Sequence, residues 1–350
     1  MSFDSHSSYN LKLFDFFRGS TLSAVQPSAN STSAAQAIAT EMVAVNRVIR
    51  QQLHSDVPLV SQIADYIISA GGKRIRPALV IMMANAFGYR GTDHHALAAV
   101  IEFIHTATLL HDDVVDESSL RRGRQTANAM FGNAASVLVG DFVYSRAFQI
   151  MVSINDMRVM RILADATNVI AEGEVLQLMN MHDPDVTEAR YLQVIRSKTA
   201  KLFESAAQLG ALVAGASDTD IEAVAEYGRS IGTAFQLIDD VLDYSGDAKE
   251  TGKNVGDDLR EGKPTLPLIH LMHHGSDDQK ALVRACIENG DEQHFDAILS
   301  AISASGALEY TRRAAENAGA QAALAIAILP NSPYKISLLD LCQFAVHRNH

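Results

Sequence analysis

The sequence of 350 residues contains no tryptophan, only two cysteines and few aromatic side chains, which make up 6% of the chain. Alanine, leucine, isoleucine and methionine are plentiful instead, and this composition favours helices. The two cysteines, Cys286 and Cys342, do not have the spacing of a metal site. We therefore expect two reduced thiols in a cytosolic protein, with a single disulfide as the less favoured alternative.

Long apolar runs and an excess of positive charge are also missing. No run approaches the ~20 apolar residues that a membrane span needs, and the first residues lack the basic and then apolar form of a signal peptide. The net charge of −12 argues against nucleic-acid binding, which needs a basic surface. An anionic substrate is not excluded, because metal ions and a local cluster of cations can invert the field at one site. We expect a cytoplasmic protein without a transmembrane segment.

The chain divides into a serine-rich beginning and a long helical remainder. Residues 1–35 show no long helical period, and we expect a flexible extension, with a transit peptide as the weaker alternative. Residues 36–350 carry helical apolar patterns broken by glycine and proline, without a convincing strand, which predicts a single all-α domain. After a first helix from about residue 35, the predicted helices span residues 60–70, 75–87, 93–115, 126–152, 158–180, 187–214, 218–245, 265–275, 277–289, 292–303, 306–328 and 333–347.

One acidic pattern, D-D-x-x-D, occurs twice, at Asp112–Asp116 and at Asp239–Asp243. Each copy follows an apolar run, where carboxylates are rare unless they are paired or bind a metal. Residues four apart share one face of a helix, so each copy would present two carboxylates to one point. Two such faces opposite each other would suit Mg²⁺, which usually also contacts a substrate's phosphates. The pattern therefore indicates a diphosphate-binding site.

Clusters of cations accompany the first acidic motif. Arg121, Arg122 and Arg124 follow it, and arginine matches phosphate oxygens with a planar fork. Upstream, two glycines precede Lys73 and Arg76, which would share one face at the start of a helix, where amide dipoles also favour an anion. Each cluster alone is compatible with a solvated loop, but beside the acidic motif they favour anion binding.

Further polar residues surround the second motif. Lys253 and Lys263 lie in the glycine-rich loop that follows it and could reach back to a leaving diphosphate. Lys198 and Thr199 lie on an otherwise apolar helix, and Gln236 lies one turn before the motif. A buried lysine needs a partner, which could be a diphosphate, Asp240 or solvent.

In chain order the motifs read G-G-K-R-I-R-P, E-F-I-H-T-A-T-L-L-H-D-D-V-V-D-E-S, R-R-G-R-Q-T-A-N, G-E-V-L-Q-L, K-T-A-K-L-F, G-T-A-F-Q-L-I-D-D-V-L-D-Y and G-K-N-V-G-D-D-L-R-E-G-K-P-T-L-P. From about residue 38 onward this series resembles the trans-isoprenyl diphosphate synthases, most of all the long-chain, octaprenyl-type polyprenyl synthases of quinone side-chain synthesis. The resemblance implies an all-α bundle around a deep central cavity, usually as a homodimer.

The resemblance also implies roles for the matching residues. The isopentenyl diphosphate site would consist of Lys73, Arg76, His105 and Arg122. The Mg²⁺ ligands on the allylic diphosphate would be Asp112, Asp116 and Asp239, with Asp113, Asp240 and Asp243 as lesser ligands or supporting residues. The remaining contacts to the allylic diphosphate would be Arg121, Lys198, Thr199, Gln236, Lys253 and Lys263. Catalysis would therefore centre on the two acidic motifs and Lys198.

The activity implied is Mg²⁺-dependent, sequential addition of isopentenyl diphosphate to an allylic diphosphate such as farnesyl diphosphate, for ubiquinone or a related quinone. The small residues Ala107 and Thr108, about one turn before Asp112, suggest an open shaft and a long product. Candidate deeper walls are Phe103, Met130, Phe131 and Met179. The resemblance leaves open a peripheral membrane contact for release of the product.

Two other functions were compared with this interpretation. A terpene cyclase also uses D-D-x-x-D, but its second metal motif is normally of a different type, and a non-catalytic partner subunit would tend to lose the acidic motifs.

The pair His94-His95 and the group His270, His273 and His274 could resemble metal sites. We expect surface or helix-end histidines in both cases, since for the second group no acidic or cysteine partner completes a ligand set.

Overall fold

The fold was analysed in a computed structural model, which describes residues 29–69, 71–121, 123–245, 256–289 and 294–348. Within these ranges the structure is helical apart from one two-stranded antiparallel hairpin. The prediction of an all-α fold is therefore confirmed. Residues 1–28, which make up most of the expected extension, lie outside the described ranges.

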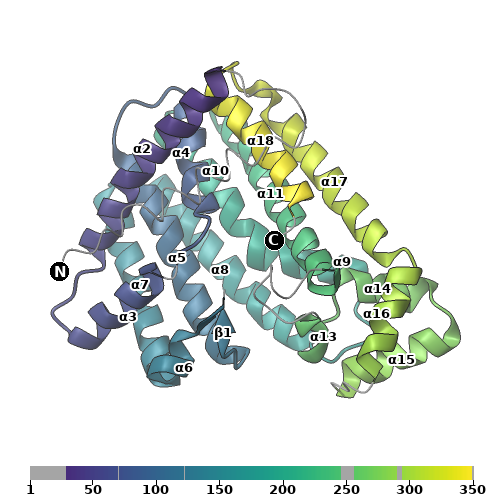
Figure 1. The fold of residues 1–350 in the computed structure, drawn as a ribbon. Helices are drawn as coiled ribbons and strands as arrows, with labels where there is room; N and C mark the ends of the chain where they lie inside the picture. The colour runs from purple at the N-terminus through teal and green to yellow at the C-terminus, as the bar shows by residue number, and fades with distance from the viewer. Residues whose placement is uncertain (1–28, 70, 122, 246–255, 290–293, 349–350) are drawn as a thin grey trace.

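The elements alternate long helices with short connections (Figure 1). The first half of the chain forms α2 (Ala29–Gln52), α3 (Pro58–Ser69), α4 (Ile75–Ala86), α5 (Asp93–Val115), β1 (Leu120–Arg121), β2 (Arg124–Gln125), α6 (Ala127–Phe131), α7 (Asn133–Ser153) and α8 (Met157–Asn180). The second half forms α9 (Glu188–Ile195), the π-helical segment η1 (Arg196–Ala200), α10 (Lys201–Val213), α11 (Asp218–Ser245), α13 (Asp257–Arg260), α14 (Leu266–His274), α15 (Asp277–Asn289), α16 (Phe295–Ala304), α17 (Ala307–Ala325), the 3₁₀ turn η3 (Ile326–Ile328) and α18 (Pro333–His347).

The structure departs from the predicted elements in several ways. The short helix α13 lies where only a loop was expected. Helix α2 begins at Ala29, earlier than expected. The helix predicted for residues 126–152 is broken at Gly132, whose φ of 86° is strained for other residues. The helix predicted for residues 187–214 contains the π-helical segment η1, and π-helical turns are frequent at functional sites. The hairpin of β1 and β2 lies just after the first acidic motif, where only a loop was expected.

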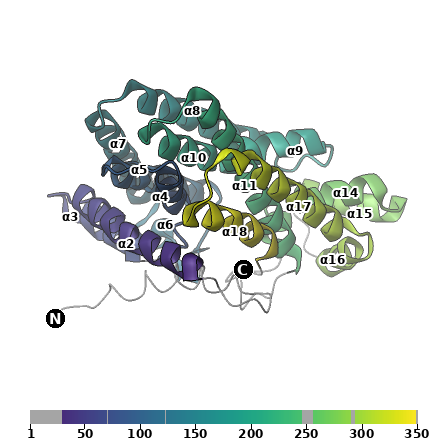
Figure 2. The same cartoon turned by 90° about the horizontal axis from the view of Figure 1, so that it is seen from above.

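The centre of the molecule consists of α4, α5, α10 and α11. Helix α4 is buried on all sides from Pro77 to Ala84, as expected of a helix that is apolar all round. Helix α10 packs against both α4 and α11, and α17 covers the other side of α11. Figures 1 and 2 show α2 and α18 side by side near one end, while α14, α15 and α16 gather at the opposite end.

Glycines allow the central helices to approach closely where the functional residues lie. A Cβ atom at Gly228 or Gly232 of α11 would lie 2.4 Å from backbone atoms of Phe203 and Ala200, respectively. A Cβ atom at Gly173 of α8 would lie 2.8 Å from the backbone nitrogen of Lys198. The backbones of α8 and α11 therefore both rest against the segment that contains η1.

Among the described residues, no helix combines the length and the low charge that a membrane-spanning segment requires. Cys286 and Cys342 are both buried and unbonded to each other, which agrees with the expected free thiols.

Candidate active site

The first acidic motif lies at the end of α5, with its carboxylates in different surroundings. The backbone nitrogen of Asp116 donates to the carbonyl of Asp112 at 2.8 Å, so the helical turn that puts both residues on one face is formed. Both side chains are largely buried. Asp113 points elsewhere and is buried with Arg121, whose Nε and second terminal nitrogen donate to the same carboxylate oxygen at 2.8 and 2.7 Å.

A lysine from η1 meets the face of Asp112. The Lys198 ammonium lies 2.6 Å from Glu174 of α8 and 3.7 Å from Asp112. Burial and the nearby charges of Asp112 and Asp116 outweigh the lysine and raise the pKa of Glu174 to about 7. Burial likewise raises the pKa of Asp112, against the opposing effect of Lys198. The site therefore holds more negative charge than its lysines neutralise.

Lys263 approaches the same face from the other side. Its ammonium lies 3.4 Å from Asp116 and 2.5 Å from Glu261. Burial alone would lower the pKa of Lys263, but the charges of Asp116, Glu261 and Asp258 raise it. A permanently charged lysine next to Asp116 suits the binding of an anion.

The second motif, at the end of α11, differs from the first. Asp240 is fully buried and accepts hydrogen bonds from Tyr191 at 2.5 Å and from Gln236 at 3.0 Å. Burial, followed by the nearby charge of Asp258, holds the pKa of Asp240 well above its usual range. Asp243 accepts from the backbone nitrogen of Asp258 at 3.3 Å. These two carboxylates fix the protein around them.

Asp239 is the exposed member of the second motif. Its side chain is 54% exposed, and one oxygen lies 2.5 Å from Arg348, the residue that follows α18. The same guanidinium donates to the carbonyl of Phe235 at 2.7 Å. Asp239 is therefore the most exposed carboxylate of this motif.

Consecutive residues of η1 connect the two motifs. Lys198 contacts Asp112, while the Thr199 hydroxyl donates to Gln236 at 2.9 Å, and Gln236 in turn donates to Asp240. The sequence left the partner of Lys198 open between diphosphate, Asp240 and solvent; its protein partners are Glu174 and Asp112. Neighbouring side chains of a helix point about 100° apart, so Lys198 and Thr199 face different helices. The motifs and η1 therefore form one site.

The upstream cation cluster joins this site along α5. The Arg76 guanidinium lies 3.4 Å from His105 Nε2, and His105 precedes Asp112 by two helical turns. Arg76 lies over the ring of Phe203, and Lys73 over that of Phe344, at 4.3 and 5.3 Å from the ring centroids. These cations therefore lie against His105 of α5 and aromatic rings of α10 and α18.

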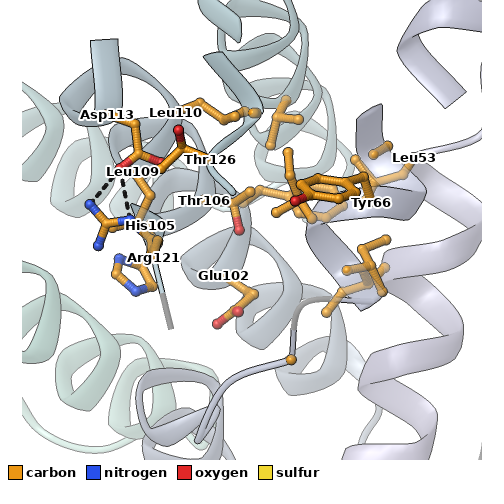
Figure 3. A pocket seen from close by; sticks show the side chains of 18 of the residues that line it. Leu53, Tyr66, Glu102, His105, Thr106, Leu109, Leu110, Asp113, Arg121 and Thr126 are labelled. Atoms are coloured by element: carbon orange, nitrogen blue, oxygen red, sulfur yellow. Dashed lines mark hydrogen bonds and ion pairs between the residues drawn. The ribbon is translucent and has the colours of Figure 1, made fainter. Parts of the chain in front are cut away.

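A small cavity of about 90 Å³ lies behind the Asp113–Arg121 pair, on the side of α5 that faces α2 and α3 (Figure 3). In Figure 3, Asp113 and Arg121 lie on one side of the cavity, and Leu53 and Tyr66 lie on the other. Thr106 lines this cavity, whereas Ala107 and Thr108 do not.

The residues expected to control product length lie on two faces of α5. Ala107 is fully buried, and Thr108 is partly buried and donates to the His105 carbonyl at 2.9 Å. Of the candidate deeper walls, Phe103 is buried and lines the cavity of Figure 3. Met130 and Met179 are 47% and 67% exposed, so neither is a wall within this chain.

Two expected site residues, Arg122 and Lys253, lie outside the described residues. Three others with clear roles in the structure were not predicted. Glu174 stands in the quoted stretch G-E-V-L-Q-L, and its charge on an apolar helix was the signal that could have revealed it. Tyr191 and Arg348 carry no comparable signal, because only the folded chain brings them to Asp240 and Asp239.

The donor set fits a hard divalent cation. Asp112, Asp116 and Glu174 offer only oxygen atoms, which Mg²⁺ and Ca²⁺ prefer. Burial of these carboxylates, and then their closeness to one another, raises the pKa of Asp112 and Glu174. A bound cation would favour their ionised forms and lower both pKa values. These three side chains could hold such a cation between them.

An all-α fold with paired acidic motifs beside lysines and arginines defines a class of enzymes that act on diphosphates through metal ions. Comparison with known proteins assigns the chain to one family within that class. The family model described as polyprenyl synthetase matches residues 57–303. This chain belongs to the polyprenyl synthetase family, whose members are prenyltransferases, and the expected resemblance is confirmed.

Individual relatives agree with the family assignment. Octaprenyl diphosphate synthase of Escherichia coli (strain K12) is 55% identical over 312 residues, which cover 89% of this chain and 97% of the relative. The all-trans-nonaprenyl-diphosphate synthase (geranyl-diphosphate specific) of Rhodobacter capsulatus is 44% identical and covers 89% and 96%. A polyprenyl synthase from Caulobacter crescentus CB15, solved with calcium and isoprenyl diphosphate, superposes with a TM-score of 0.88 at 43% identity and covers 93% and 100%.

Proposed function

We propose that this chain is a long-chain trans-polyprenyl diphosphate synthase of the octaprenyl type. It adds isopentenyl diphosphate units, one after another, to an allylic diphosphate such as farnesyl diphosphate. The observation that carries the proposal is the link through Lys198 and Thr199 between the two acidic motifs. The high identity to an octaprenyl diphosphate synthase along nearly its whole length supports the long-chain product.

Different residues of the site would bind the two substrate diphosphates. Lys198 and Lys263 flank Asp112 and Asp116, where they can contact the allylic diphosphate. Bound Mg²⁺ supplies positive charge to the departing pyrophosphate. As the allylic C–O bond breaks, the two ammonium groups stabilise the negative charge that develops on the leaving oxygens.

The second substrate lies further along α5. Lys73, Arg76 and His105 would hold the diphosphate of isopentenyl diphosphate with its double bond near the allylic carbon, and this proximity favours attack. A C–C bond then forms and one proton is lost. The carboxylates nearest the reaction are already paired with lysines, so the departing pyrophosphate is the base in this proposal.

The tail of the product would grow along the face of α5 that carries Asp112. Thr108 lies four residues before Asp112 and shares this face, about 6 Å along the axis. Thr108→Phe should place a ring in the path and stop elongation after a few units. Thr106→Phe is the matched control, because Thr106 points into the cavity of Figure 3. Ala107→Tyr should also shorten the product, but Ala107 is fully buried.

The direct test is an assay of the purified chain with isopentenyl diphosphate, farnesyl diphosphate and Mg²⁺, followed by chromatography of the products. We expect elongation that ceases when Mg²⁺ is chelated, and products near octaprenyl. Metal-independent elongation would contradict the proposed metal site. A wild-type product length in an active Thr108→Phe enzyme would place the tail elsewhere.

We further propose a cytoplasmic homodimer that supplies the side chain of ubiquinone or a related quinone, with a peripheral membrane contact for product release. Exposed apolar side chains on neighbouring helices support the dimer: Val137 and Leu138 on α7, and Val175, Leu178 and Met179 on α8. Burial of such a surface against a second copy would be favourable. Sedimentation at several protein concentrations tests the assembly.

A further inference from the structure

Two histidines and a glutamate converge at the opposite end of α5 from the acidic motif. His94 and His95 lie in the first turn of α5, and Glu41 lies in the middle of α2. One oxygen of Glu41 lies 2.8 Å from His94 Nε2 and 2.5 Å from His95 Nε2. The potential ligand atoms of all three side chains lie within 4.8 Å of one another. This group is named the Glu–His–His cluster below.

The convergence is unusual for consecutive residues of a helix. Neighbouring side chains normally point about 100° apart and do not face each other. Here the two imidazole rings have centroids 4.1 Å apart and planes inclined by 31°. Both rings are turned toward the same carboxylate, which comes from a different helix. The expectation of ordinary surface or helix-end histidines is therefore incomplete, since this pair shares an acidic partner.

His94 is a buried imidazole. Its side chain is 3% exposed, its Nε2 atom faces Glu41, and its Nδ1 atom is buried without a hydrogen bond to any described residue. Burial, followed by the charge of His95, lowers the pKa of His94, against the opposing effect of Glu41. A neutral imidazole is the form that binds metals.

We propose that Glu41, His94 and His95 form a binding site for a divalent transition metal of the Zn²⁺ type. Two imidazoles and one carboxylate are a ligand set that Zn²⁺ accepts and that Mg²⁺ does not favour. Ligand atoms at ~2.0–2.1 Å from a tetrahedral ion lie roughly 3.3 Å apart. The Glu41 oxygen, at 2.8 and 2.5 Å, therefore needs to move away from the two Nε2 atoms by less than about 1 Å, and water would complete the coordination.

The neighbourhood is compatible with a bound cation. Tyr89 packs edge-on against His94, with ring centroids 5.1 Å apart. Asp93 lies close enough to favour the positive form of His94, and Asn85 donates to the second oxygen of Glu41 at 3.4 Å. The metal would fasten α2 to the start of α5. His95 and Asp112 lie 17 positions apart on one helix, which corresponds to roughly 25 Å, so this site is separate from the acidic motifs.

The experiment measures zinc bound to the full-length protein in the presence of excess Mg²⁺, which occupies the acidic motifs. We expect about one equivalent of Zn²⁺ to remain after gel filtration and the melting temperature to rise on zinc addition. Glu41→Gln and His95→Gln should each weaken zinc binding by at least about tenfold, the lower end of what loss of a supporting ligand contact costs. Prenyl transfer should continue in both variants.

His274→Gln is the matched control. His270 and His274 also have adjacent rings, 4.5 Å apart, but their rings stack with each other and with Tyr310. Zinc binding should survive this change. Retention of wild-type zinc affinity in folded Glu41→Gln, or a wild-type protein that retains no zinc, would overturn the proposal.

A second measurement covers variants that fail to fold. Zinc added to the wild-type protein should shift the imidazole NMR signals of His94 and His95 and leave those of His270 unchanged. Shifts confined to other histidines would equally overturn the assignment.

Discussion

The two D-D-x-x-D motifs have the same letters but different physical surroundings. The first holds Asp112 and Asp116 in a partly buried, crowded group with Lys198 and Lys263. The second exposes Asp239 to solvent and buries Asp240 in hydrogen bonds from Tyr191 and Gln236.

The difference shows that a repeated motif does not imply repeated roles. In the first motif two carboxylates are available to a cation, and the third, Asp113, anchors Arg121. In the second motif Asp239 is the most exposed carboxylate, while Asp240 accepts from Tyr191 and Asp243 accepts from the backbone of Asp258. The first copy is arranged mainly for charge, and the second mainly for positioning.

The largest expected effect separates accessible from buried carboxylates. Asp112→Asn and Asp239→Asn should each lower turnover by about 10²–10³-fold, since each removes a charge that stabilises the reacting complex. Asp240→Asn is a change of the same size but should lower turnover far less, because this buried side chain already has hydrogen-bond partners within the protein. Steady-state kinetics on all three, with circular dichroism to confirm folding, make the comparison. Equal losses of turnover in all three variants would show that the accessible and the buried carboxylates do not differ in role.

The second prediction asks whether the cations along α5 serve a different substrate. Arg76→Ala should raise the KM for isopentenyl diphosphate about tenfold or more, and the KM for the allylic diphosphate much less, because it removes a charge-assisted contact to one diphosphate. Arg76 is tied to His105 and Phe203, away from the lysines of the first motif. A selective defect for the allylic substrate would reverse the two site assignments.

The third prediction concerns the positioning role of the second motif. Tyr191→Phe removes a hydrogen bond from fully buried Asp240 and should lower the free energy of unfolding by about 1–3 kcal/mol. Tyr310→Phe is the control, because the Tyr310 hydroxyl also donates to a carboxylate, that of Glu188, at 2.8 Å but in a more exposed place. Urea unfolding measures both. An equally small change in the two variants would remove Asp240 from its structural role.

The sequence predicted the fold well, for physical reasons. The boundaries of α5 and α15 follow from apolar periodicity and flanking breaks, and the structure gives the same residues. The break at Gly132 and the π-helical segment η1 were missed. A backbone shift of one residue hardly alters apolar periodicity, so the pattern contained little sign of η1.

The partners of the site residues were harder to predict than the residues themselves. Lys198 was identified, but its partner Glu174 lies on another helix. That contact depends on the close approach of α8 at Gly173 to the backbone of η1. Such an approach is set by packing in three dimensions and has no fixed spacing in the sequence.

The smallest expected effect concerns whether the crowded negative charges of the first motif lower the stability of the folded protein. Its indicator is Glu174, whose pKa in the folded protein is raised to about 7 by burial and the charges of Asp112 and Asp116, from 4.5. In this interval the folded protein retains a proton that the unfolded chain has lost. The contribution of Glu174 to stability is therefore full below pH 4.5 and is lost as the pH rises through about 7.

Melting temperatures of the metal-free protein should accordingly fall by a few degrees across this pH range, and Glu174→Gln should make this fall smaller. Glu172→Gln is the control, because Glu172 lies on the exposed side of the same helix. Added Mg²⁺ or Ca²⁺ should reverse the fall, since a cation favours the ionised carboxylates. A pH profile that Glu174→Gln leaves unchanged would mean that Lys198 already neutralises the first motif, and the contrast in charge between the two motifs would be lost.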